Sequence, residues 1–142
     1  MQIQEVMSKT AMVIDPNTTI RDVAAKLRAE DIGALPVGEN DRLIGLVTDR
    51  DIVMRAVAEG KSPANTTARQ VMSENVYYCF EDEDVEQAAK VMAERQVRRL
   101  PIVNRDKRLV GVVSLADLGT KAGDAGATAL GGVSEATGQA RR

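Results

Sequence analysis

Hydrophobic positions follow a helical spacing in two parts of the chain. The two groups are Ile20, Val23, Ala24 and Leu27, and Val85, Ala88, Ala89 and Met92. Within each group the members fall at i, i+3, i+4 and i+7, which puts them on one face of an α-helix. Thr19 stands three residues before Asp22, as in a capping box. The pattern predicts two amphipathic helices, the first of which begins at about Thr19.

Short apolar runs bounded by polar turns predict strands around these helices. One run precedes each helix (residues 11–14 and 76–80), and two follow it (34–37 and 43–48; 100–103 and 108–114). A second helix follows in each half, over residues 49 to about 58, where Gly60 ends it, and over 115 to about 121. The predicted order is strand, helix, strand, strand, helix, and it occurs twice.

An internal repeat underlies this order. The matching blocks are Val6-Met7-Ser8 and Val71-Met72-Ser73, Leu35-Pro36-Val37 and Leu100-Pro101-Ile102, and Leu43–Thr48 and Leu109–Ser114. The first two pairs are offset by 65 residues and the third by 66. Three blocks in one order at nearly constant spacing indicate a duplicated unit.

The duplication sets the expected fold and domain organisation. The expected domains are a first repeat (1–60), a linker (61–67), a second repeat (68–121) and a Gly/Ala-rich tail (122–142). Neither repeat has enough strands to cover the apolar face of its sheet. We therefore expect an α/β (α+β) fold in which two β-α-β-β-α repeats pack sheet to sheet with pseudo-twofold symmetry. The tail is interpreted as a docking tail or a flexible end, because it has few bulky side chains.

Composition narrows the classes of function. The 142 residues include 19 Lys and Arg against 21 Asp and Glu, a balance that does not indicate a nucleic-acid partner. The absence of His excludes His-dependent catalytic triads and His metal sites, and the single Cys79 excludes an intrachain disulfide. No apolar run approaches the roughly 20 residues of a membrane span, and no signal-peptide pattern is present, so we expect a cytoplasmic protein without a membrane partner.

Each repeat contains the pattern Gly-hydrophobic-hydrophobic-Thr/Ser-x-x-Asp after a Leu-Pro strand. The two stretches are Gly45-Leu46-Val47-Thr48-Asp49-Arg50-Asp51 and Gly111-Val112-Val113-Ser114-Leu115-Ala116-Asp117. The pattern resembles the cystathionine β-synthase (CBS) domain, and two copies over about residues 3–118 resemble a CBS pair, or Bateman module. The resemblance implies a regulatory module that binds AMP, ADP, ATP, S-adenosylmethionine or sometimes NAD in two clefts between the copies. It also implies a homodimer, here of a stand-alone module whose regulated partner is unknown.

The motif itself has two interpretations. As local structure, Thr48 with Asp51 and Ser114 with Asp117 are capping boxes, with the hydroxyl at the N-cap and the carboxylate at N3. As a ligand site, the same carboxylates accept ribose hydroxyls while the hydroxyl and the helix N-terminus meet phosphate. The two interpretations are compatible.

Arg98 and Arg99 precede the second Leu-Pro strand, whereas Gly33 and Ala34 precede the first. A solvated arginine pair is the simpler explanation. The resemblance implies instead that the residues before each Leu-Pro strand face the aspartate motif of the other copy, so the arginines approach Thr48 and Asp51 and the Gly33-Ala34 pair approaches the second motif. Because a guanidinium fork suits phosphate, the arginine cleft is expected to bind a phosphorylated ligand more tightly.

The aromatic residues Tyr77, Tyr78 and Phe80 fall within four positions. The simple interpretation is a strand with Tyr78 and Phe80 on one face and Tyr77 on the other. The resemblance places this segment beside an adenine slot, which adds Tyr77 and Val76, and Thr10 and Ala11 of the first repeat, to the candidate ligand-binding residues. Cys79 is expected to be half-buried and structural.

Three functions follow from these observations. The leading hypothesis is a non-catalytic sensor of an adenine nucleotide that needs no cofactor or metal. The alternatives are a ligand-free protein-interaction module, or a binder of S-adenosylmethionine or NAD. An enzyme is disfavoured, since no nucleophile–base pair is visible. A homodimer is also expected because the helix over residues 49–58 presents a wide apolar stripe, formed by Ile52, Val53, Ala56 and Val57.

Overall fold

The computed structural model describes residues 1–9, 13–123, 127 and 131–132. These residues form two compact units. Those of 12–76 make the first-repeat unit, and those of 1–11 and 77–142 make the second-repeat unit. Thr10, Ala11 and most of the predicted tail lie outside the described residues. The mixed α/β class expected from the sequence is confirmed.

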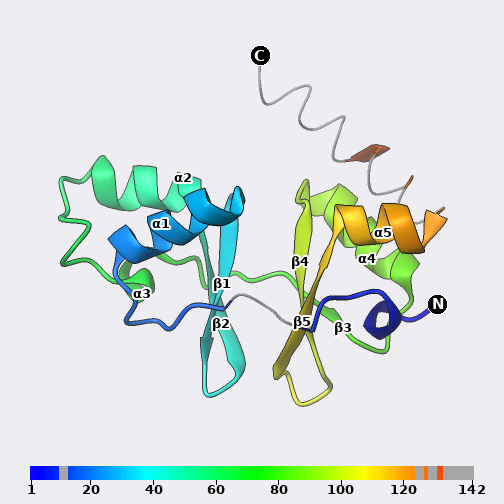
Figure 1. The fold of residues 1–142 in the computed structure, drawn as a ribbon. Helices are drawn as coiled ribbons and strands as arrows, with labels where there is room; N and C mark the ends of the chain where they lie inside the picture. Colours follow the sequence, from blue (N-terminus) through cyan, green and yellow to red (C-terminus); the bar gives the residue numbers. More distant parts are fainter. Residues whose placement is uncertain (10–12, 124–126, 128–130, 133–142) are drawn as a thin grey trace. The chain divides into compact units, whose positions relative to one another are not determined.

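The first-repeat unit holds a two-stranded antiparallel sheet with helices packed on it (Figure 1). Its elements are α1 (Ile20–Glu30), β1 (Ala34–Glu39), β2 (Arg42–Thr48), α2 (Asp49–Ile52), the π-helix η2 (Val53–Val57) and α3 (Ala68–Val71). A buried core joins α1 to the sheet through side chains such as Ile20, Val23 and Val47.

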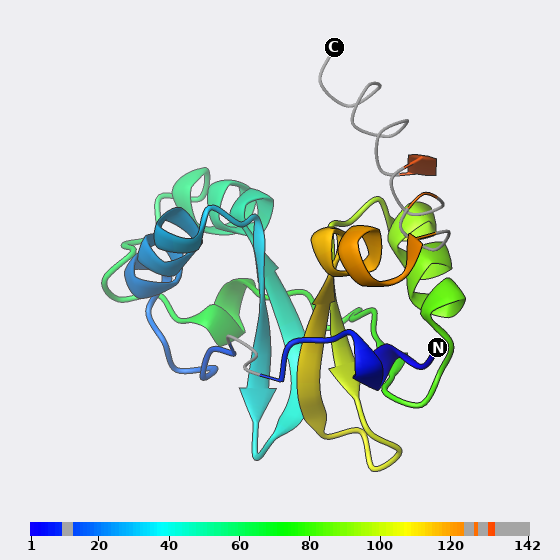
Figure 2. The same ribbon diagram turned by 45° about the vertical axis from the view of Figure 1, so that its right-hand side comes forward.

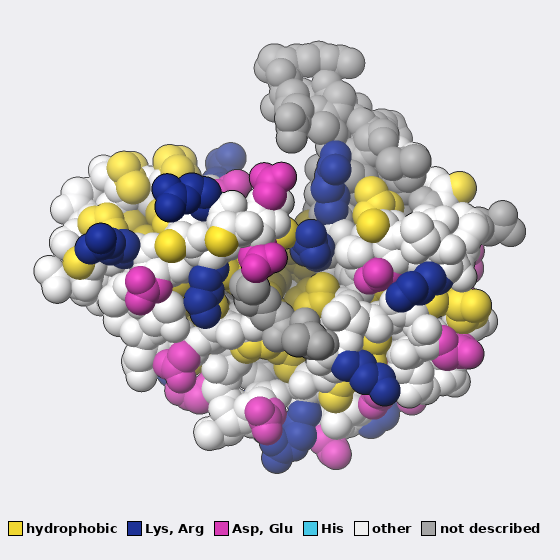
Figure 3. All heavy atoms as spheres, viewed as in Figure 1, with side chains coloured by type: hydrophobic (Ala, Val, Ile, Leu, Met, Phe, Trp, Pro, Cys, Tyr) yellow, Lys and Arg dark blue, Asp and Glu magenta, His cyan; other side chains and the backbone are white. Residues whose placement is uncertain are grey.

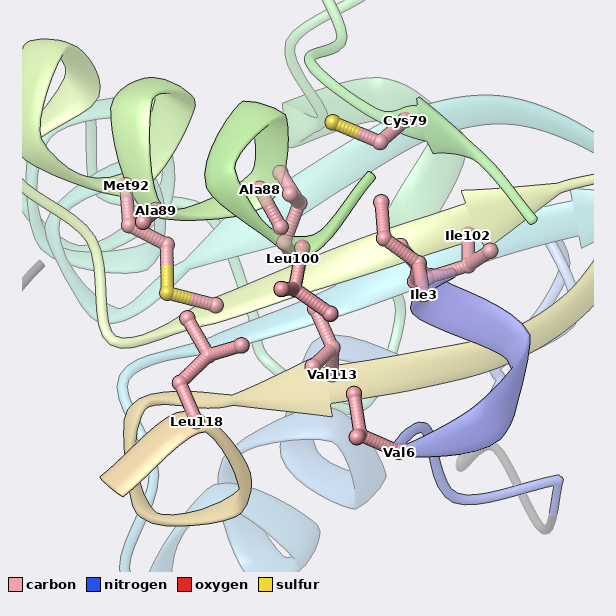
Figure 4. Close-up of a cluster of buried hydrophobic side chains, with 11 residues drawn as sticks. Ile3, Val6, Cys79, Ala88, Ala89, Met92, Leu100, Ile102, Val113 and Leu118 are labelled. Carbon is pink, nitrogen blue, oxygen red and sulfur yellow. The ribbon is translucent and has the colours of Figure 1, made fainter. Parts of the chain in front are cut away.

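The second-repeat unit holds a three-stranded sheet in the order β3-β4-β5. Its strands β4 and β5 are the yellow-green and olive arrows in Figure 2. Its elements are η1 (Ile3–Glu5), β3 (Cys79–Phe80), α4 (Val85–Arg95), β4 (Arg99–Val103), β5 (Leu109–Ser114) and α5 (Leu115–Lys121). Strand β3 is parallel to β4, and β4 is antiparallel to β5. Ile3 and Val6 pack with Met92 of α4 and Leu118 of α5 around the sheet (Figure 4).

Five local expectations differ wholly or partly from the structure. Of the strand expected over residues 11–14, residues 11 and 12 lie outside the described residues, and Ile14 forms a single bridge, to Val37. The expected strand over 76–80 is reduced to β3, because only Cys79 and Phe80 pair with β4. Ala24 is exposed, because the core covers only the narrower stripe of Ile20, Val23 and Leu27. The helix after β2 changes to π geometry at Val53. Cys79 is also more buried than expected, with 1% of its surface exposed.

Each unit contains the Val-Met-Ser segment that begins the other repeat. We call residues 6–8 and 71–73 the Val-Met-Ser segments. Ser8 pairs with Val112 of β5 through two backbone hydrogen bonds of 2.9 and 3.0 Å. Ser73 pairs in the same way with Leu46 of β2, at 2.8 and 3.0 Å. The compact units therefore differ from the sequence repeats, whose domain boundaries stay a prediction.

A glycine on each strand admits the neighbouring Val-Met-Ser segment. A Cβ atom added at Gly45 would lie 2.5 Å from the sulfur of Met72, and one added at Gly111 would lie 2.6 Å from the carbonyl oxygen of Ser8. Real Cβ atoms do not approach so closely. The glycine of the Gly-hydrophobic-hydrophobic motif is therefore explained in both repeats by the close packing of a Val-Met-Ser segment, through the Met72 side chain at Gly45 and the Ser8 carbonyl at Gly111.

Candidate functional site

The two Thr/Ser-x-x-Asp motifs fold into the same local structure. The hydroxyl of Thr48 accepts from the backbone N–H of Asp51 at 3.0 Å, and Asp51 Oδ2 accepts from the N–H of Thr48 at 2.9 Å. Ser114 and Asp117 make the equivalent pair of hydrogen bonds, both of 3.0 Å. All four residues are half-buried. The capping boxes predicted from the spacing are confirmed.

Strand register places each candidate pair beside the motif of its own repeat. Arg99 is the cross-strand partner of Ser114, and the carbonyl of Arg98 accepts from the N–H of Leu115 at 2.8 Å. In the first repeat Ala34 is the partner of Thr48, and the carbonyl of Gly33 accepts from Asp49 at 2.9 Å. Both arginine side chains are exposed. The predicted approach of Arg98 and Arg99 to Thr48 and Asp51 joins residues of different units and stays a prediction.

The charged residues that lie beside the two motifs differ. A Cβ atom at Gly33 would lie 3.4 Å from Asp49 Oδ2, so a carboxylate stands next to the first motif. The positions of the second repeat that match Gly33 and Asp49 carry Arg98 and the uncharged Leu115. The second motif therefore has Arg98 and Arg99 beside it in its own unit, whereas the first has the carboxylate of Asp49 and the guanidinium of Arg55, which lies 3.9 Å from Asp51 Oδ1.

The aromatic segment divides as its alternation predicted. Tyr78 and Phe80 meet edge to face, with ring centroids 5.7 Å apart. Tyr77 instead packs against the core of the second-repeat unit, and the guanidinium of Arg95 lies 5.9 Å from its ring centroid. Burial raises the pKa of Tyr77, although Arg95 opposes the shift. Val76 is half-buried. A ligand role for this segment stays a prediction.

A salt bridge fixes the outer end of the same segment. Arg105 donates to both carboxylate oxygens of Asp82, at 3.0 and 2.8 Å, and lies 4.2 Å from the ring centroid of Phe80. These hydrogen bonds lower the pKa of Asp82. Arg105 is therefore occupied by contacts within its own unit.

Two cations that sequence analysis did not single out contact the Val-Met-Ser segments. Arg55 Nη1 donates to the carbonyls of Val71 and Met72, at 3.0 and 3.1 Å. Lys121 Nζ donates to the carbonyl of Val6 at 3.4 Å. Both cations stand four residues after the motif aspartate, a repeated spacing that could have drawn attention to them.

Other chemistry is limited within the part of the chain that the structure describes. No three His, Cys, Asp or Glu side chains gather there as a metal site would require. None of the described helices has the length and apolar character needed to cross a membrane. Burial raises the pKa of the Cys79 thiol to about 12, with a further contribution from the charge of Glu83. That thiol is thus neutral at physiological pH.

Comparison with known proteins identifies several similar chains. Hypoxic response protein 1 of Mycobacterium tuberculosis is 37% identical over 116 residues, which cover 81% of this chain and 80% of the relative. The uncharacterized protein MK0525 of Methanopyrus kandleri is 37% identical over 117 residues, and the match spans 82% of this chain but only 60% of that protein. Among solved structures, the CBS domain pair of protein MJ0100 is in complex with 5′-methylthioadenosine and S-adenosyl-L-methionine. It matches with a TM-score of 0.69 and 28% identity over 84% of this chain and 94% of that one.

The crystal structure of Hypoxic Response Protein I contains two coordinated zinc ions. It matches with a TM-score of 0.75 and 35% identity over 85% of this chain and 98% of that one. Structural zinc sites in proteins are built from Cys and His ligands, whereas this chain has no His and one buried Cys. The residues present do not fit a zinc site built from those ligands.

The family is identified by a match that covers both repeats. The model of the CBS domain matches residues 3–58 and again residues 68–119. These ranges contain both Thr/Ser-x-x-Asp motifs and both Val-Met-Ser segments. The chain belongs to the CBS domain family and carries a tandem pair of CBS domains.

Proposed function

We propose that this protein is a non-catalytic cytoplasmic sensor that binds an adenine nucleotide of the AMP, ADP or ATP type and requires no other cofactor. The observation that carries the proposal is the duplicated Thr/Ser-x-x-Asp motif, which forms the same half-buried capping box in both CBS domains. The complex of the MJ0100 pair with two adenosyl compounds supports an adenosyl ligand. S-adenosylmethionine is therefore the second candidate ligand.

Each proposed contact follows from side-chain chemistry. Asp51 and Asp117 accept the ribose hydroxyls, because their boxes engage Oδ2 and a carboxylate has further acceptor sites on Oδ1. Thr48 and Ser114 lie beside the phosphate. Other residues that line the ligand in this proposal are Gly33, Ala34, Val76 and Tyr77, together with Thr10 and Ala11.

The two binding sites are proposed to be unequal. Arg98 and Arg99 have no cationic counterpart at Gly33 and Ala34. Each charge-assisted hydrogen bond to phosphate contributes roughly 1.5–3 kcal/mol. Two such bonds would separate the affinities by one to several factors of ten, at about 1.4 kcal/mol per factor. The site that includes the arginines should therefore prefer AMP to adenosine, and the other site should discriminate less.

A homodimer belongs to the same proposal. Of the predicted apolar stripe, Ala56 is buried and Ile52 packs against the core of its own unit. Val53, Met54 and Val57 are 55%, 54% and 60% exposed, a large apolar area over η2 (Figure 3). A second copy that packs there about a twofold axis would remove this area from water.

Two measurements test the proposed function. Mass spectrometry of small molecules released from the purified protein should detect an adenosyl compound. AMP at 100 times its dissociation constant should raise the free energy of unfolding by about 2.7 kcal/mol, measured as a thermal shift. A ligand-free interaction module would show neither result, and turnover of AMP or ATP would contradict a non-catalytic role.

A further inference from the structure

The last helix of each repeat is tied to a Val-Met-Ser segment by one cation. Arg55 reaches the carbonyls of Val71 and Met72, and Lys121 reaches the carbonyl of Val6. The two cations occupy equivalent positions in the two repeats, since each follows its motif aspartate by four residues. They are unequal in strength, because arginine makes two hydrogen bonds near 3.0 Å and lysine one of 3.4 Å.

The segment that Arg55 holds leads out of the first-repeat unit. We call residues 68–76 the connector, because residue 77 is the first of the second-repeat unit on this side. Val71 and Met72 are buried, and Ser73 pairs with Leu46. The connector is thus packed on β2 by apolar and backbone contacts, and Arg55 links it to the helix that carries the motif.

Arg55 also faces the motif. Its Nη1 lies 3.9 Å from Asp51 Oδ1, while Oδ2 of the same carboxylate accepts from Thr48. One guanidinium therefore stands between an anion and two connector carbonyls. A donor that engages Oδ1 reduces the pull of the carboxylate on the guanidinium and favours its hydrogen bonds to the connector.

We infer that Arg55 is a positioning residue that couples occupancy of the Thr48–Asp51 motif to the connector. The inference depends on the proposed function only for the ligand, because the hydrogen bonds of Arg55 to the connector form without one. In the second repeat Lys121 makes the weaker equivalent contact with residues 6–8, which precede the other crossing between the units, at residues 11 and 12. The two repeats then differ in how strongly the coupling contact is made, with two hydrogen bonds near 3.0 Å from Arg55 and one of 3.4 Å from Lys121.

Hydrogen exchange of the full-length protein, measured by mass spectrometry with and without AMP, tests the inference. Without ligand, Arg55→Gln should speed exchange of the Met72 and Ser73 amides by at least about fivefold, the effect of one lost net hydrogen bond. AMP should slow these amides in the wild type and leave them unchanged in Arg55→Gln. Arg55→Lys, which restores one cationic donor, should recover part of the response.

Lys121→Gln is the matched control, because it should speed exchange only in residues 6–8. AMP binding is followed by calorimetry in the same samples. Binding to the wild type without any change in the connector overturns the coupling and leaves the proposed function intact. Absence of AMP binding counts against the proposed function and the coupling together, whereas unchanged exchange in ligand-free Arg55→Gln overturns the role of Arg55 alone.

Discussion

Gly111 shows how a motif residue can serve packing rather than ligand chemistry. An added Cβ would meet the Ser8 carbonyl at 2.6 Å and the Met7 sulfur at 2.8 Å. Gly111→Ala should therefore lower the free energy of unfolding by about 1–3 kcal/mol, measured by denaturant titration.

Gly119→Ala is the matched control in the following helix. Gly119 has nothing within 4 Å of its added Cβ, so alanine should stabilise α5 by about 0.5–1 kcal/mol. Equal effects of the two substitutions would contradict the packing explanation.

The thiol of Cys79 should make the free energy of unfolding depend on pH. The folded-state pKa of its thiol is about 12 against an ordinary 9.0. Below pH 9 the thiol is protonated in both states. Between pH 9 and about 12 only the unfolded chain releases the proton, so this contribution to stability is lost as pH rises. The difference in free energy of unfolding between wild type and Cys79→Ala should shrink across this window in urea titrations, and parallel curves would refute it.

At the scale of elements, both long helices end in a left-handed residue that is not glycine. Asp31 follows α1 with φ of 53° and Gln96 follows α4 with φ of 59°. Because this conformation costs a side-chain-bearing residue about 1–2 kcal/mol, Gln96→Gly should raise the melting temperature. Lys90→Gly, at an exposed position inside α4, should lower it. A loss of stability in Gln96→Gly would contradict the assigned cap.

The spacing of apolar residues predicted the helices that bury a continuous apolar stripe and the strands that form a continuous apolar run. It located α1, α4 and the paired strands β1, β2, β4 and β5 to within a few residues. It missed η1 and α3, which have three and four residues, too few to show a period. It could not separate the π-helix η2 from the helix before it, because both present their apolar residues at similar spacing.

The candidate site was predictable only where it is local. The capping boxes depend on residues three apart, and the spacing alone identified them. The contact of Arg55 with Val71 depends on the packing of one repeat's first segment in the other repeat's unit, which no pattern along the chain encodes. The position of Arg99 opposite Ser114 likewise became visible only from strand register.

At the scale of the whole molecule, the exposed face of η2 predicts the oligomeric state. The wild type should sediment at twice the chain mass of 15.3 kDa at micromolar concentration. Val53→Glu should shift it toward the monomer, because a charge then occupies the apolar interface. Ala29→Glu, on the exposed side of α1, is the control and should leave the dimer intact. A monomeric wild type would contradict the proposed dimer.

The central claim is that the two motif aspartates bind an adenosyl ligand. Calorimetric titration of AMP into the wild type, Asp51→Ala and Asp117→Ala measures this directly, with Asp22→Ala, at the equivalent N3 position of α1, as the control for lost capping. Each motif variant should lose one binding phase, while Asp22→Ala keeps both. The double variant Arg98→Ala/Arg99→Ala should lose the tight phase, which is also the phase that one of the two aspartate variants loses. Wild-type affinity in both Asp51→Ala and Asp117→Ala would contradict the account.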